Sequence, residues 1–188
     1  MNIIFITLSV LLGVFCFFQF MLINRLAKET IIDTQTELKN YRWLKKRLEL
    51  LIKKNRTKDA YPLSLAILDI DNFRRFNKKG IRLGDEVLYE FATHLNNLVV
   101  DYTGTRNVVR YRLGDEFAII FENKNKAQAD EIMKKILNTF VQNFIKTESH
   151  PDPIYISFSY GLAQVAKNDT FDVFIGAVER DLVCQKSK

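Results

Sequence analysis

Residues 108–121 read VVRYRLGDEFAIIF and hold two short apolar segments on either side of a compact turn. The first segment is Val108–Arg112, the second is Phe117–Phe121, and Leu113-Gly114-Asp115 lies between them. Short apolar runs around a glycine-containing turn are typical of a β-hairpin. Further upstream, residues 63–70 read LSLAILDI, which indicates a buried strand ending in carboxylates. The fold is therefore expected to be built on a sheet that contains these three strands.

Segments with helical spacing of apolar residues surround these strands. We predict four helices, in the segments 40–54, 84–99, 127–145 and 171–184. One further strand is predicted in the segment 154–165. The resulting order is helix, strand, helix, strand, strand, helix, strand, helix. This order predicts an α/β (α+β) sandwich in which helices cover a partly antiparallel sheet.

Composition and charge exclude several classes of protein. The 188 residues are 47% hydrophobic and 27% charged, which excludes a disordered chain. The net charge of +6 is local, because residues 25–59 hold eleven Lys or Arg and five Asp or Glu, whereas residues 60–188 hold seventeen of each. A nucleic-acid-binding surface normally spreads over the folded domain, so no nucleic-acid partner is expected. Two Cys and two His fit neither a disulfide framework nor a zinc site.

The N-terminal segment is strongly apolar. Residues 3–23 contain no charged side chain and would form a helix about 31 Å long, which predicts a transmembrane anchor over residues 1–24. A basic juxtamembrane segment, residues 25–58, follows and leads into the domain. By the positive-inside rule, we expect a single-pass protein of the inner (cytoplasmic) membrane with its C-terminal domain in the cytoplasm. The basic segment is either a solvated helix face or a contact with inner-membrane lipid.

Four carboxylates lie at the ends of predicted strands. Asp69 and Asp71 end the first strand, and Asp115 and Glu116 follow the turn of the hairpin. If these strands are neighbours, the carboxylates meet at one edge, where one or two of them could bind Mg²⁺. We expect Asp69 and Asp115 to bind the metal, because an acidic residue at the end of an apolar strand is costly without a partner. Asp71 is expected to cap the next helix. Glu116 is left as either a solvated side chain or part of the site.

These residues also carry a resemblance to a known family. The segments that match are Asp69–Asn77 (DIDNFRRFN), Gly80, Leu83–Leu88 (LGDEVL), Leu113–Phe117 (LGDEF), Asp33–Arg42 (DTQTELKNYR), Ser159–Gly161 (SYG) and Ala177–Lys186. Together and in this order they resemble the GGDEF domain of diguanylate cyclases, over about residues 33–188. The resemblance implies a ferredoxin-like, polymerase-palm-type fold. It also implies a dimer, formed with itself or with another GGDEF protein, that condenses two GTP to cyclic di-GMP and two pyrophosphates.

The resemblance also implies roles for individual residues. Asp69 and Asp115 would hold Mg²⁺ (or Mn²⁺) with the help of the Ile70 carbonyl. Asp115 or Glu116 would help to deprotonate the ribose 3′-hydroxyl.

The remaining predicted roles concern the nucleotide. Asn77 and Asp85 would form hydrogen bonds with guanine, and Leu38 and Phe73 would pack near it. The triphosphate would face two cations, Arg74 and Lys186.

The sequence departs from the family pattern at several positions. Leu113 replaces the first glycine of the signature, so a bulkier residue is expected in the turn. Asn77 and Asp85 are one residue closer than usual, and Ile81 replaces the usual His. The R-x-x-D motif for product inhibition is missing, with Gly104 and Asn107 in its place, so feedback through that site is not expected. The alternative to an active cyclase is a degenerate domain that binds GTP or a protein partner without turnover, as a receptor or scaffold.

Overall fold

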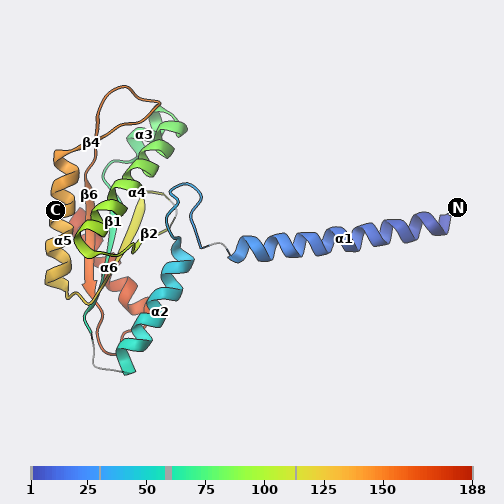
Figure 1. Ribbon diagram of the computed structural model, residues 1–188, viewed down its shortest axis with the longest axis horizontal. Helices are drawn as coiled ribbons and strands as arrows, with labels where there is room; N and C mark the ends of the chain where they lie inside the picture. Colours follow the sequence, from blue (N-terminus) through green and yellow to red (C-terminus); the bar gives the residue numbers. More distant parts are fainter. Residues whose placement is uncertain (1, 30, 58–60, 113, 188) are drawn as a thin grey trace. The chain divides into compact units, whose positions relative to one another are not determined.

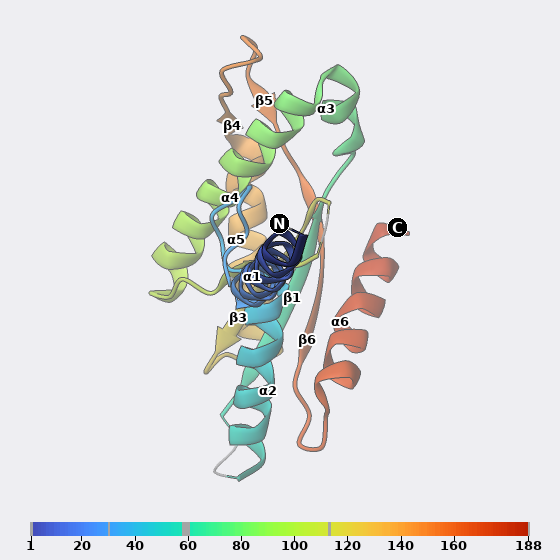
Figure 2. The ribbon, with the colours of Figure 1, turned by 90° about the vertical axis from the view of Figure 1, so that its right-hand side faces the viewer.

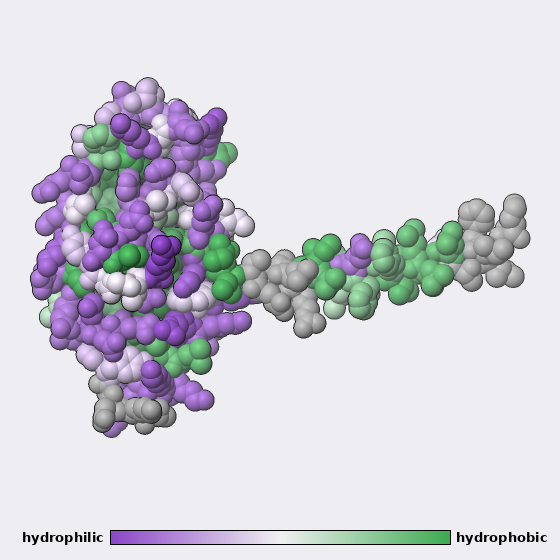
Figure 3. Space-filling model, viewed as in Figure 1, coloured by the Kyte–Doolittle hydropathy of each residue, from purple (hydrophilic) through white to green (hydrophobic). Residues whose placement is uncertain are grey.

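A computed structural model describes the backbone of residues 2–29, 31–57, 61–112 and 114–187. It describes the side chains of these residues except 2–7 and 24–29. The chain divides into two units, Met1–Ile31 and Ile32–Lys188. The first unit contains one helix, α1 (Asn2–Glu29). Its described side chains are mostly apolar and exposed, as the surface colouring in Figure 3 shows.

The structure corrects the expected localisation. Within the described part of the chain, no helix combines the length and the apolar character that crossing a membrane requires. The predicted single-pass localisation in the inner membrane is therefore wrong. The transmembrane anchor over residues 1–24 and the lipid contact that depended on it are not supported.

A four-stranded antiparallel sheet forms the centre of the second unit, in the order β2-β3-β1-β6 (Figure 1). Its strands are β1 (Leu63–Ile70), β2 (Val108–Arg110), β3 (Glu116–Glu122) and β6 (Phe158–Gln164). The predicted hairpin is confirmed as β2 and β3, and β1 has the predicted bounds. The sheet was predicted to be partly antiparallel. Among the described residues, all of its strand pairs are antiparallel.

Helices cover both faces of this sheet (Figure 2). Those of the second unit are α2 (Tyr41–Thr57), α3 (Arg74–Lys79), α4 (Ile81–Thr103), α5 (Lys126–Gln142) and α6 (Phe171–Lys186). One apolar core joins the sheet to α4 and α5, and the other joins it to α2 and α6.

The helix predicted over residues 127–145 ends earlier, at Gln142, because the chain then enters a small two-stranded sheet. The strands of this second sheet are β4 (Phe144–Ile145) and β5 (Ile154–Tyr155). The strand predicted over residues 154–165 is correspondingly divided into β5 and β6.

Side chains of β1 alternate between the two cores, as the pleat of a strand requires. Ala66, Leu68 and Ile70 pack on the α4–α5 side, while Leu65 and Ile67 pack on the α2–α6 side. Asp69 continues the second series, so its carboxylate belongs to the side of the sheet that α6 covers.

Candidate functional site

The register of the sheet brings the predicted acidic residues together. Asp69 on β1 lies directly opposite Glu116 on β3. The backbone N–H of Ile70 donates to the carbonyl oxygen of Asp115, 3.3 Å away. Antiparallel pairing thus places the end of one apolar strand beside the start of the other, and three carboxylates meet where the apolar segments stop.

The carboxylates at this edge repel one another. Burial is the main cause that raises the pKa of both the Asp115 and the Glu116 carboxyl, and the negative charge of Asp69 is the second. The ammonium of Lys186, from the last turn of α6, lies 2.7 Å from the Asp69 carboxylate. A cation therefore already balances part of the negative charge at this edge.

The donor set at this edge suits a divalent cation with a preference for oxygen. Within the residues that the structure describes, no group of three or more His, Cys, Asp or Glu side chains is arranged as a ready metal site. Mg²⁺, however, is commonly held by one or two carboxylates, with water and phosphate oxygens completing its shell. Asp69 and Asp115 are two such carboxylates at one strand edge, and Asp69 already pairs with the Lys186 ammonium.

Asp71 has a different environment from Asp69. Its carboxylate accepts hydrogen bonds from the Ser157 and Ser159 hydroxyls, at 2.7 and 2.8 Å. Its backbone N–H donates to the Ser157 carbonyl, 3.0 Å away. The expectation that Asp71 caps a helix is wrong, because Phe73 occupies the cap position of α3 and no side-chain hydrogen bond caps that helix. Asp71 instead fixes the end of β1 to β6.

The predicted guanine-binding residues lie close together on α3 and α4. A Cβ atom built on Gly84 would lie 1.9 Å from the Asn77 Oδ1 atom, so the Asn77 amide rests against the backbone just before Asp85. Asn77 and Asp85 are both exposed, which leaves their polar groups accessible. The one-residue shortening between them has therefore not separated them.

The other predicted nucleotide-binding residues differ in exposure. Phe73 is buried in the α4–α5 core, and Leu38 packs partly buried against the same core. Arg74 is exposed in the first turn of α3, and Lys186 is drawn toward Asp69. The apolar residues are thus fixed by packing, whereas Arg74 faces solvent.

The signature turn is supported by a residue that the sequence reasoning missed. Arg110 is only 4% exposed, and its guanidinium donates to the Gly114 carbonyl oxygen. Burial lowers the pKa of Arg110, while the nearby carboxylates of Asp33, Asp115 and Glu116 oppose that effect. A charged residue in an apolar strand segment was the signal that could have identified it. Leu113 itself lies outside the described residues.

The end of β2 is also held to α6. The Tyr111 hydroxyl donates to Glu179 Oε1 at 2.7 Å, and Arg112 forms an ion pair with the same carboxylate at 3.0 Å. Glu179 therefore links α6 to the segment that leads into the signature turn.

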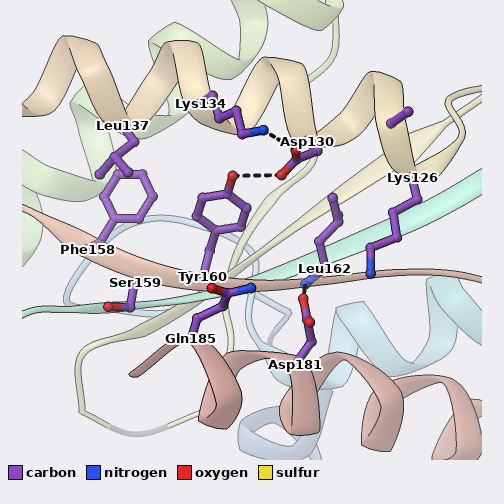
Figure 4. Close-up of a pocket in the computed structure, with 11 residues that line it drawn as sticks. Lys126, Asp130, Lys134, Leu137, Phe158, Ser159, Tyr160, Leu162, Asp181 and Gln185 are labelled. Carbon is purple, nitrogen blue, oxygen red and sulfur yellow. Dashed lines mark hydrogen bonds and ion pairs between the residues drawn. The ribbon is translucent and has the colours of Figure 1, made fainter. Parts of the chain in front are cut away.

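A separate groove of about 710 Å³ lies between α5, β6 and α6 (Figure 4). Asp130 on its α5 side accepts from the Tyr160 hydroxyl and pairs with Lys134, and Asp181 on its α6 side accepts from the Leu162 N–H. None of the predicted site residues lines this groove, so it is distinct from the acidic edge of β1 and β3.

Comparisons with known proteins agree with this fold. A family model described as "Diguanylate cyclase, GGDEF domain" matches residues 30–188. The biofilm architecture maintenance protein MbaA of Vibrio cholerae is 31% identical over 141 residues, which is 72% of this chain; the chain spans only 17% of that relative's length.

Solved structures show the same fold. The GGDEF domain of DgcB from Caulobacter crescentus, solved in complex with c-di-GMP, has a TM-score of 0.75 at 22% identity, covering 84% of this chain and 88% of that one. The diguanylate cyclase SiaD from Pseudomonas aeruginosa, solved with its activator SiaC, has a TM-score of 0.74 at 21% identity, covering 96% and 68% respectively. The family match over residues 30–188 shows that this chain belongs to the diguanylate cyclase GGDEF-domain family.

Proposed function

We propose that the protein is a diguanylate cyclase, which condenses two GTP into cyclic di-GMP and releases two pyrophosphates. The observation that carries this proposal is the register that places Asp69 opposite Glu116 and beside Asp115. Phosphoryl transfer depends mainly on positioning and on neutralising charge, and a rigid strand pair provides the positioning.

The residues of this edge have complementary tasks in the proposed reaction. Asp69 and Asp115, with the Ile70 carbonyl, would hold Mg²⁺ or Mn²⁺, which supplies positive charge to the triphosphate when bound. Asp115 or Glu116 accepts the proton of the ribose 3′-hydroxyl, and burial favours this because it raises the pKa of both carboxyl groups. Lys186 moves from Asp69 to the triphosphate as the nucleotide enters.

The base is recognised by two exposed residues, Asn77 on α3 and Asp85 on α4. Guanine presents acceptor atoms and, beside them, two N–H donors. The Asn77 amide donates to the acceptors, and the Asp85 carboxylate accepts from the donors, so the pair matches guanine and does not match adenine. Phe73 and Leu38 supply the apolar wall near the base.

We further propose that the active form contains two copies of the domain. The product has two phosphodiester bonds between two nucleotides, and one site of this kind holds one GTP. Two sites that face each other each provide one 3′-hydroxyl and one α-phosphate. The initial rate is therefore expected to rise with the square of protein concentration at low concentration, and a rate that rises only linearly over the whole range would contradict the dimer.

The test of activity is direct. The full chain is incubated with GTP and Mg²⁺, and cyclic di-GMP is measured by mass spectrometry. Product is expected from the unaltered protein and no product from Asp69→Asn or Asp115→Asn. Asp101→Asn, the same change at an exposed residue in the last turns of α4, is the matched control and should retain activity.

A second candidate is a domain that binds GTP without turnover. The replacement of the first signature glycine by Leu113 favours it, because leucine is bulkier than the glycine that the family has at this position. GTP binding without cyclic di-GMP, both in the protein and in Leu113→Gly, would assign this role. Product that appears only in Leu113→Gly would show that this substitution alone silences the enzyme.

A further inference from the structure

A tight turn precedes α2 and holds one exposed side chain in a fixed place. The Asp33 carboxylate accepts from the Thr36 N–H and hydroxyl at 2.9 and 2.7 Å. The Asp33 N–H donates to the Leu38 carbonyl at 2.7 Å, and Glu37 adopts a left-handed φ of 59°. Thr36 is only 3% exposed. Gln35 therefore projects from a well-ordered turn.

This turn is also attached to the sheet. Lys39 forms a parallel bridge with Val109, and its carbonyl oxygen accepts from the Arg110 N–H at 2.8 Å. The position of the Gln35 backbone relative to the domain is thus set by several hydrogen bonds on both sides.

From this turn, Gln35 reaches α4 and contacts the proposed base-recognition site. Its Nε2 atom donates to Oδ1 of Asp85, a residue 50 positions further along the chain. Asp85 is the carboxylate proposed to accept the two N–H donors of guanine, for which it needs both of its oxygens. In this structure one of those oxygens is already occupied by Gln35.

We propose that Gln35 is a gate on the base site, which must leave Asp85 before guanine can bind. The inference rests on the proposed function, because it assumes that Asp85 recognises the base. Gln35 and Asp85 also line a cleft of about 680 Å³ together with Tyr89 and Lys146. Rotation of the Gln35 side chain moves its amide into this open space and leaves the turn backbone unchanged.

The gate has a measurable cost for binding. When the competent state is only a fraction of the population, the apparent dissociation constant rises by the inverse of that fraction. A hydrogen bond of ordinary net strength corresponds to a factor of about three to ten. Gln35→Met keeps the length of the side chain and removes the donor, so it should tighten guanine-nucleotide binding about threefold to tenfold.

The experiment measures binding without turnover. The full chain is titrated calorimetrically with a GTP analogue whose α–β bridging oxygen is replaced by methylene. Gln35→Met is compared with the unaltered protein and with Thr34→Ala, a neighbouring exposed position on the same turn. Tighter binding in Gln35→Met alone supports the gate. Equal or weaker binding in Gln35→Met overturns it, since the amide would then be neutral or would help to orient Asp85.

A double-mutant cycle with Asp85→Ala separates this inference from the function on which it rests. Asp85→Ala is expected to weaken binding, and the benefit of Gln35→Met should disappear in its background. If Asp85→Ala leaves affinity unchanged, the proposed base site is wrong. If Asp85→Ala weakens binding and Gln35→Met changes nothing, only the gate is wrong. A benefit of Gln35→Met that persists without Asp85 also overturns the gate.

Discussion

The two faces of the sheet are built differently. The α4–α5 face is closed by aromatic rings, with Phe91 at 5.1 Å from Phe117, 4.7 Å from Phe140 and 5.9 Å from Phe158 between ring centroids. The α2–α6 face brings α6 so close to β6 that a Cβ on Gly161 would lie 2.2 Å from the Leu182 backbone nitrogen. The first face is distinguished by its cluster of aromatic rings, and the second by the close approach of the α6 backbone to β6.

This difference assigns different tasks to the two faces. Asp69 continues the α2–α6 side of β1, and Lys186 reaches it from the last turn of α6. The proposed chemistry therefore depends on how closely α6 packs, while most of the free energy of folding is expected to come from the aromatic face. Mutations on the first face should alter stability, and mutations on the second should alter the site as well.

The largest expected effect is that of Phe91→Ala on the aromatic face. Phe91 is fully buried and contacts three other rings, so its truncation should lower the free energy of unfolding by about 3–5 kcal/mol. Urea denaturation followed by circular dichroism measures the loss. Leu50→Ala on the exposed side of α2 is the control and should change stability by less than about 0.5 kcal/mol. A loss below about 1 kcal/mol for Phe91→Ala would contradict the division of tasks.

Gly161→Ala tests the other face. Its Cβ would meet the backbone of Leu182 and Val178, which cannot move aside as a flexible side chain can, so α6 must shift at a cost of about 1–3 kcal/mol. The shift also displaces Lys186, and nucleotide affinity should fall with stability. Gly176→Ala, on α6 itself, is the matched control because its Cβ would approach only the tip of Arg180, 3.2 Å away. Equal stability of the two variants would refute the close approach.

Tyr111→Phe removes one hydrogen bond between α6 and the residue that follows β2. The loss of the bond to Glu179 should cost about 1 kcal/mol at neutral pH. Burial, followed by the hydrogen bond to Glu179, raises the pKa of Tyr111 above its ordinary value. The stabilisation is therefore complete below the unfolded-state pKa and decreases as the pH rises above it. Unfolding measured between pH 8 and 11 should show a steeper decline for the unaltered protein than for Tyr111→Phe; parallel curves would speak against this contact.

Lys186→Met should have the smallest effect on stability. Its ion pair with Asp69 is partly exposed, and such pairs contribute little, so the free energy of unfolding should change by less than about 0.5 kcal/mol. GTP affinity should nevertheless fall severalfold, because a cation proposed to face the triphosphate is lost. Unchanged affinity, measured by calorimetry, would remove Lys186 from the site.

Much of the frame could be predicted from local patterns in the sequence. The apolar run in residues 63–70 and the turn between two further apolar runs predicted β1 and the β2–β3 hairpin. They also indicated that Asp69 and Asp115 would approach one edge if these strands were neighbours, and the pairing of β1 with β3 meets that condition.

The contacts that could not be predicted link segments distant in sequence. Asp71 bonds to two serines at the start of β6, more than 80 positions away, and Arg110 is buried near a turn that precedes it by about 75 residues. The Gln35 contact with Asp85 belongs to the same class. Periodicity does not predict these contacts, since helical and strand patterns describe only what lies on a face and not what that face will meet.

The central position of β1 has a consequence for how the protein is made. Leu63 pairs with Glu122, and Ser64 pairs with Gln164, so the two neighbours of β1 arrive about 60 and 100 residues later during synthesis. Pairing over such separations slows folding. Until the ribosome has produced β6, one edge of an almost wholly apolar strand stays open to foreign strands. Newborn chains that stop short of residue 158 are therefore the form of this protein most prone to aggregate and most in need of chaperones.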